Sequence, residues 1–118
     1  MKRMRSYVAL VLVVMVLTVT AHAEQWRTCD VYPSLTLSNY VASCEVDIYA
    51  NSSSDAVSAT MELWRGTTKL NSWSTSGTYH VSMQETEGVT RYRTYRLVVN
   101  YKVNGVEQPP VEISQYYG

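Results

Sequence analysis

The feature that most limits the possible folds of this chain is an alternation of apolar and polar residues in short runs beyond residue 29. In the run 41–50, for example, the apolar residues Cys44, Val46 and Ile48 are separated by polar ones. Side chains of a β-strand point alternately to opposite faces, so each run predicts a strand with one apolar and one polar face. Valine, threonine and tyrosine are frequent and helical periodicity is almost absent, which favours an all-β domain.

Turn residues divide these runs into about seven short strands. The expected strands cover residues 32–37, 41–50, 57–63, 69–74, 79–83, 91–103 and a segment that follows residue 105. The expected turns lie at 51–55, 65–68 and 74–77. Strands of this number and spacing predict an all-β domain at 24–118, a single antiparallel two-sheet sandwich of immunoglobulin-like type.

The last hairpin has the clearest local signal. Asn104-Gly105 lies between alternating runs, and a type I′ turn requires positive φ at both central positions, which suits this pair. Uninterrupted pairing beyond the turn would place the carboxylate of Glu112 on the core face. We therefore predict a β-bulge at Pro109-Pro110, where prolines cannot donate to the ladder, so that Val111 and Ile113 turn inward.

The first 23 residues are typical of a secretory signal peptide. A basic start, Met1–Arg5, precedes an apolar run at 7–20, and Ala21-His22-Ala23 supplies the small residues of a cleavage site. The apolar run has about 14 residues, whereas a membrane-spanning helix needs roughly 20. We expect cleavage before Glu24 and a secreted, extracellular product without a stable membrane anchor.

The charge of the exported part argues against nucleic acid as a partner. The chain has 10 basic and 10 acidic residues. Three of the basic residues lie in the signal peptide, so seven remain against ten acidic ones, a net charge of about −3. Nucleic-acid binding depends on basic clusters that neutralise phosphates.

The two cysteines, Cys29 and Cys44, predict a structural disulfide in an exported protein. The bridge would close a loop of about 15 residues, which contributes roughly 3 kcal/mol in the chain-entropy description. The alternatives are a metal pair or a reactive thiol. A metal site requires more ligands than two cysteines and His80, the one histidine outside the signal peptide.

Three segments carry a resemblance to a known group of proteins. They are Cys44-x-Val46-x-Ile48, Ser72-Trp73-Ser74-x-Ser76-Gly77 and Tyr92-Arg93-x-Tyr95-Arg96-Leu97-Val98-Val99. Most of the exported chain is similar to small bacterial exported proteins of Gram-positive species that are functionally uncharacterised and have an immunoglobulin- or fibronectin-type-III-like pattern. The resemblance implies a tyrosine-corner role for Tyr95, with its hydroxyl bonded to upstream backbone, although a merely buried tyrosine is the alternative. A Cys29–Cys44 bridge would depart from immunoglobulin domains, whose disulfide joins the two sheets.

The sequence offers few groups for catalysis. Alternation places His80 on the solvent face of its strand. Glu85 and Glu87 could form a carboxylate pair of the kind used in glycoside hydrolysis, but a solvated loop accounts for them better. The segment Ser52–Asp55 could contact calcium, yet one carboxylate among hydroxyls is a weak ligand set. We expect neither an enzyme nor a cofactor.

A binding face is a better candidate. If the strands at 57–63 and 91–103 are neighbours, their outward residues form one patch of mixed chemistry. Its members are Glu62, Trp64, Arg96, Asn100 and Lys102, with Val98 between them. Aromatic and arginine side chains are common anchors in interfaces, and an exposed aromatic ring also suits sugars. The alternative is a purely structural role, in which Glu62 pairs with Arg96 or Lys102 and Trp64 shields the sheet.

These observations leave three classes of function. We expect a noncatalytic extracellular binding or interaction module whose partner is an extracellular protein or glycan. The alternative is a small secreted antagonistic effector or inhibitor. A hydrolase is the third class, and it would require a catalytic base that the sequence does not supply.

Overall fold

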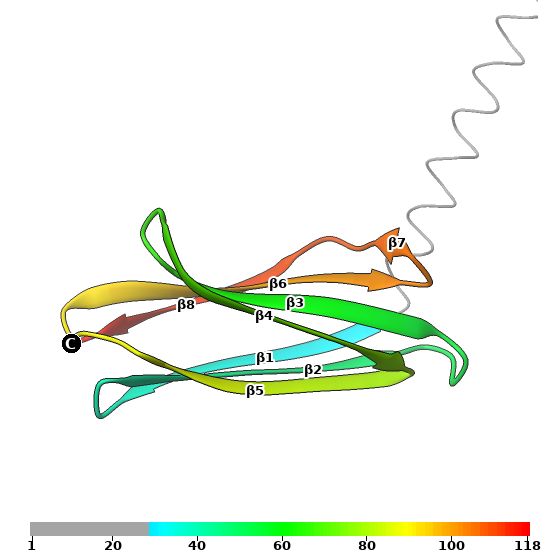
Figure 1. Ribbon diagram of the computed structural model, residues 1–118, viewed down its shortest axis with the longest axis horizontal. Coiled ribbons are helices and arrows are strands. Elements are labelled where there is room, and N and C mark those ends of the chain that lie inside the picture. Colours follow the sequence, from blue (N-terminus) through cyan, green and yellow to red (C-terminus); the bar gives the residue numbers. More distant parts are fainter. Residues whose placement is uncertain (1–28) are drawn as a thin grey trace, which may run out of the picture.

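The computed structural model describes residues 29–118, which form eight antiparallel strands in two stacked sheets (Figure 1). The predicted signal peptide and its cleavage site lie outside these residues. The three-stranded sheet contains β1 (Cys29–Ser38), β2 (Val41–Ala50) and β5 (His80–Gly88). The five-stranded sheet contains β3 (Ala56–Arg65), β4 (Thr68–Thr78), β6 (Arg93–Val103), β7 (Val106–Glu107) and β8 (Val111–Tyr117). Within 29–118, no helix has the length and apolar character needed to cross a membrane.

The strand order confirms the predicted immunoglobulin-like sandwich. One sheet runs β1-β2-β5, and the other runs β4-β3-β6-β7 with β8 also beside β6. In constant-type immunoglobulin domains the fourth strand joins the sheet of the first, second and fifth strands. Here β4 pairs instead with β3. This pairing gives the larger sheet a broad outer face made of β4, β3 and β6.

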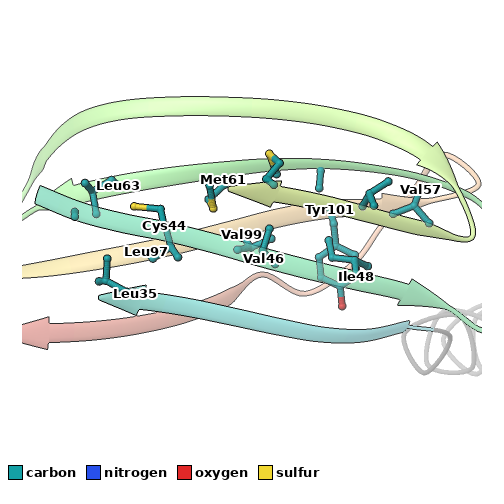
Figure 2. Packing of buried hydrophobic residues seen from close by; sticks show 14 of the residues in the cluster. Leu35, Cys44, Val46, Ile48, Val57, Met61, Leu63, Leu97, Val99 and Tyr101 are labelled. Carbon is teal, nitrogen blue, oxygen red and sulfur yellow. The ribbon is translucent and has the colours of Figure 1, made fainter. Parts of the chain in front are cut away.

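The core fills the space between the sheets with the apolar residues of the alternating runs. Val46 and Ile48 of β2 face Val99 and Tyr101 of β6 across this layer (Figure 2). All four side chains are buried. Burying one aliphatic side chain of this size contributes roughly 1.5–3 kcal/mol, so the period-two burial that is clearest in β2, β3 and β6 is the main source of stability.

Two tight hairpins fix the pairing of their strands. Asn104 and Gly105 have φ values of 51° and 78°, which confirms the predicted type I′ geometry between β6 and β7. Asn39 and Tyr40 have φ values of 54° and 61° and form a similar turn between β1 and β2. A tyrosine is rare in this conformation. Here its backbone N–H donates to the hydroxyl of Tyr117, 2.8 Å away.

The predicted bulge after the last hairpin is also confirmed. Val103 pairs with Val106, whereas Val99 pairs with Val111, so residues 108–110 lie opposite only two residues of β6. The extra residue shifts the register by one position. Val111 and Ile113 therefore pack against the core, and the Glu112 side chain is exposed.

The predicted Cys29–Cys44 disulfide is wrong for this structure. In the β1–β2 hairpin Cys29 lies opposite Ala50, and Cys44 lies opposite Leu35. Leu35 is six positions along β1 from Cys29, about 20 Å at the rise of an extended strand. A disulfide requires Cα atoms within about 7 Å of each other, so the register keeps these two thiols apart.

The predicted turn at 74–77 is wrong as well. Serine, threonine and glycine are typical of turns, but pairing with β3 holds this segment extended as far as Thr78. The hydroxyls of Thr60 and Ser74 share a hydrogen bond of 3.0 Å across the two strands. The chain then passes from one sheet to the other through the single residue Tyr79, at a φ of 69°.

Tyr95 confirms the expected tyrosine corner. Its ring is fully buried, and its hydroxyl donates to the carbonyl oxygen of Thr90 at 2.8 Å. The same hydroxyl accepts from the backbone N–H of Thr90 at 2.9 Å. Thr90 lies in the connection between β5 and β6, so this pair of bonds fixes a link between the two sheets.

Candidate ligand-binding faces

The outer face of the larger sheet brings together most of the predicted patch. β3 and β6 are neighbours, as expected, with Trp64 opposite Arg96 and Thr60 opposite Asn100. The carboxylate of Glu62 accepts from Trp64 Nε1 and from Asn100 Nδ2, each at 3.4 Å. We call Glu62, Trp64, Arg96 and Asn100 the Trp64 patch.

The ring of Trp64 has a cation close to it from each neighbouring strand. The Arg96 guanidinium carbon lies 5.4 Å from the ring centre, and Lys69 Nζ lies 5.9 Å from it. Cations at such distances are attracted to the ring's electron density. The ring is therefore part of an ordered charged surface and is half-buried, so it does not offer a fully open stacking platform.

The charge pairs of this face differ from the predicted ones. Glu62 pairs with Lys69 at 3.5 Å, and Arg96 pairs with Glu112 at 3.5 Å. Because all four side chains retain contact with water, each pair contributes at most about 1 kcal/mol. The sequence did not indicate Lys69, since the position of β4 beside β3 was not predicted.

Lys102 lies further along β6, away from Trp64 and next to a hollow in the same face. The hollow has a volume of about 460 Å³. Its lining is mainly hydroxyl, amide and charged groups from β3, β4, β6 and β7. The lining residues are Ser58, Ala59, Thr60, Ser74, Thr75, Ser76, Asn100, Tyr101, Lys102 and Glu107. Asn100 belongs to both the hollow and the Trp64 patch, so the two are continuous.

Sequence reasoning missed most of this lining. The composition of 74–77 predicts a turn, and a turn does not place these β4 hydroxyls beside β3. Their alternation at 72, 74 and 76 was the available signal, because it gives one strand face composed of hydroxyls.

The candidate catalytic residues are placed away from this hollow. His80 is exposed on the three-stranded sheet, as predicted, with Nε2 3.1 Å from Asp47 Oδ1 and its ring stacked on Tyr49. The hydrogen bonds from His80 and then Ser82 hold the pKa of Asp47 below its ordinary value. Among the described residues, no group of three or more potential metal ligands gathers at one point.

Glu85 and Glu87 correct a prediction, because they lie in β5 and not in a loop. They occupy the same strand face as the buried Val81 and Met83 and are themselves half-buried. Glu87 accepts a hydrogen bond from Asn71 of β4 at 3.0 Å. Inward-pointing charges on an edge strand discourage pairing with another chain, which gives these carboxylates a structural role.

The segment Ser52–Asp55 is likewise occupied by local structure. One carboxylate oxygen of Asp55 accepts from the backbone N–H of Ser52 at 3.1 Å. The other accepts from the side chain of Asn104 at 3.0 Å. The carboxylate thus links two turns at one end of the sandwich.

The chain is, by its strand order and tyrosine corner, an immunoglobulin-like β-sandwich with polar outer faces. No family model and no curated protein matches it. Its fold is similar to part of a β-glucuronidase of Bacteroides uniformis, with a TM-score of 0.51, 12% identity and coverage of 76% of this chain. It is also similar to part of an exo-chitosanase of Amycolatopsis orientalis, with a TM-score of 0.50, 12% identity and the same coverage. The chain spans 13% of the length of each enzyme, and at this identity the likeness concerns the fold alone.

Proposed function

We propose that this protein is a noncatalytic extracellular binding module, and that its ligand contacts the outer face of β4, β3 and β6. The observation that carries the proposal is the polar hollow that continues into the Trp64 patch. A site of this kind combines a concave surface, several hydrogen-bonding groups and one large aromatic ring.

The chemistry of the hollow favours a ligand rich in hydroxyl or amide groups. Serine and threonine hydroxyls can donate and accept, the Asn100 amide does both, and Lys102 and Glu107 add one donor and one acceptor of opposite charge. A glycan matches this pattern of mixed donors and acceptors. Arg96 and Trp64 at the border would contact the next part of an extended ligand.

Catalysis is not part of the proposal because the described lining of the hollow contains one carboxylate, Glu107, and no imidazole, whereas glycoside hydrolysis uses a pair of carboxylates. His80, the imidazole within residues 29–118, is on the opposite sheet and bonded to Asp47. A general base must be within hydrogen-bond reach of the proton that it removes, so His80 cannot act on a ligand in the hollow, which is on the other side of the core.

The test is a binding screen with purified, immobilised protein against cell-wall polymers, other glycans and secreted proteins. For a glycan that binds, Asn100→Ala with Lys102→Ala should weaken binding roughly ten-fold or more, since two hydrogen bonds of about 1 kcal/mol each are lost. Thr36→Ala, on the exposed face of β1, is the matched control and should leave the affinity unchanged.

Binding that survives both this double variant and Trp64→Ala with Arg96→Ala would exclude the outer face of β4, β3 and β6. The extracellular location has a separate test. Mass spectrometry of the protein recovered from culture medium should give a chain that begins at Glu24, and retention of residues 1–23 inside the cell would contradict it.

A further inference from the structure

A second cluster of side chains lies on the opposite side of the molecule, on the outer face of β1, β2 and β5. Tyr49 is at its centre, stacked on His80 with ring centres 4.2 Å apart and interplanar angle 4°. The rings of Tyr32 and Tyr79 meet Tyr49 edge-on, at 6.1 and 6.4 Å. The three tyrosines are 58%, 37% and 42% exposed for Tyr32, Tyr49 and Tyr79, an open aromatic surface in the described part of the chain.

Carboxylates alternate with these rings. The strand register places Asp30 opposite Tyr49, and Asp47 opposite Tyr32. Directly opposed residues on one sheet face have Cβ atoms about 5 Å apart, so each carboxylate lies beside a ring. We call Asp30, Tyr32, Asp47, Tyr49, Tyr79 and His80 the aromatic-acidic face.

The charge of this sheet has one sign. Strands β1, β2 and β5 contain no lysine or arginine. They contain five acidic residues, namely Asp30, Glu45, Asp47, Glu85 and Glu87. The bonds from His80 and Ser82 favour the charged form of Asp47 and hold the pKa of its carboxyl below the ordinary value. The negative charge on the aromatic-acidic face therefore has no nearby lysine or arginine from its own sheet.

We propose that the aromatic-acidic face binds a basic segment of a partner protein, with a lysine or arginine side chain over Tyr32 and its charge beside Asp30 and Asp47. The negative charge of the aromatic-acidic face favours a positively charged ligand. The exposed rings favour arginine and lysine over simple metal ions, because a cation over a tyrosine ring gains from the ring's electron density while its stem packs on the ring.

The observations favour a foreign basic segment over a second copy of this chain. On the outer face of the five-stranded sheet, two of the cations already have partners, Lys69 with Glu62 and Arg96 with Glu112. Docking that face onto the aromatic-acidic face of another copy would have to break these pairs. An extended peptide with unpaired arginines meets no such cost.

The test uses a fluorescein-labelled hexa-arginine peptide and the purified full chain, with fluorescence anisotropy at about 0.15 M salt, where long-range attraction is screened. We expect saturable binding. Tyr32→Ala should raise the dissociation constant about two- to five-fold, the size of one exposed cation–π contact. Tyr32→Ala with Asp30→Asn should raise it about ten-fold in total, since a charge contact is lost as well.

Glu112→Gln is the matched control, because it removes the same charge from the opposite sheet. If Glu112→Gln weakened binding as much as Asp30→Asn does when it is added to Tyr32→Ala, the attraction would come from net charge alone and the proposal would be overturned. Absence of saturable binding, equal binding of a hexa-glutamate peptide, or self-association of the protein abolished by Tyr32→Ala would also overturn it. Unchanged circular dichroism of each variant shows that the fold is retained.

Discussion

At the scale of single residues, Cys44 shows how burial decides the chemistry of a side chain. Cys44 is completely buried, and burial, followed by the charge of Glu87, raises the pKa of its thiol to about 11. The thiolate is the reactive form of cysteine. We predict that Cys44 is alkylated by iodoacetamide at pH 8 roughly 100-fold or more slowly in the folded protein than in concentrated urea.

Peptide mapping by mass spectrometry measures this rate on the peptide that contains Cys44. The urea-unfolded sample is its control, because the same thiol there has an ordinary pKa. Fast modification in the folded protein, or a Cys29–Cys44 bridge in the nonreduced map, would contradict the register of β1 on β2.

Alternation predicted the environment of individual residues well but not the distances between them. It placed Val46 and Ile48 inside and His80 outside, and the structure agrees. The cysteine pairing failed because opposed residues of a hairpin are equally distant from its turn. Cys29 precedes the turn at Asn39–Tyr40 by ten residues and Cys44 follows it by four. The expected first strand begins at residue 32, which leaves Cys29 outside the hairpin and free to approach Cys44, whereas β1 begins at Cys29.

At the scale of elements, the β6–β7 hairpin depends on the backbone of its turn. A Cβ at Gly105 would meet no atom within 4 Å, yet the residue has a φ of +78°. This conformation costs an L-residue about 1–2 kcal/mol. We predict that Gly105→Ala lowers the free energy of unfolding by about 1 kcal/mol, measured by urea denaturation.

Gly88→Ala is the control for this prediction. A Cβ at Gly88 also meets nothing within 4 Å, and its φ lies outside the left-handed region. The substitution should change stability by less than about 0.5 kcal/mol. If Gly105→Ala and Gly88→Ala lowered the free energy of unfolding equally, the positive φ of the turn would not be the cause of the loss.

The same hairpin shows which element-level features are readable from sequence. Asn104-Gly105 and the two prolines are local signals, and they predicted both the turn and the bulge. The path of β4 has no such signal, because Ser74–Gly77 has turn-like composition and becomes a strand only through pairing with β3. The hollow was missed for that reason, whereas the Trp64 patch needed only the predicted neighbourhood of β3 and β6.

At the scale of the whole molecule, the two sheets differ in charge as well as in strand number. The strands of the three-stranded sheet contain five carboxylates and His80 but no lysine or arginine. All lysines and arginines of the described strands lie in the larger sheet. The two proposed faces are the outer faces of the two sheets, so they point in opposite directions. Because the sheets differ in charge, the two faces suit different partners. Both depend on the sheets keeping their relative position.

The tyrosine corner is the side-chain contact that ties the β5–β6 connection to β6, beside backbone bonds such as the one from Val89 N–H to the Tyr40 carbonyl oxygen at 2.9 Å. Tyr95 is buried, and its hydroxyl makes two bonds to Thr90 in the β5–β6 link. Removing the hydroxyl leaves the Thr90 N–H and carbonyl without these partners. We predict that Tyr95→Phe lowers the free energy of unfolding by about 1–3 kcal/mol.

Tyr101→Phe is the matched control, since Tyr101 is also a buried tyrosine of β6 and the described residues give its hydroxyl no hydrogen bond. Its unfolding free energy should change by less than about 0.5 kcal/mol. Urea denaturation followed by tryptophan fluorescence measures both variants, and an unchanged slope shows that the same surface is exposed on unfolding. If Tyr95→Phe were as stable as the parent, the link between the sheets would be held by apolar packing and by its other hydrogen bonds, and the corner would be a consequence of the fold and not one of its supports.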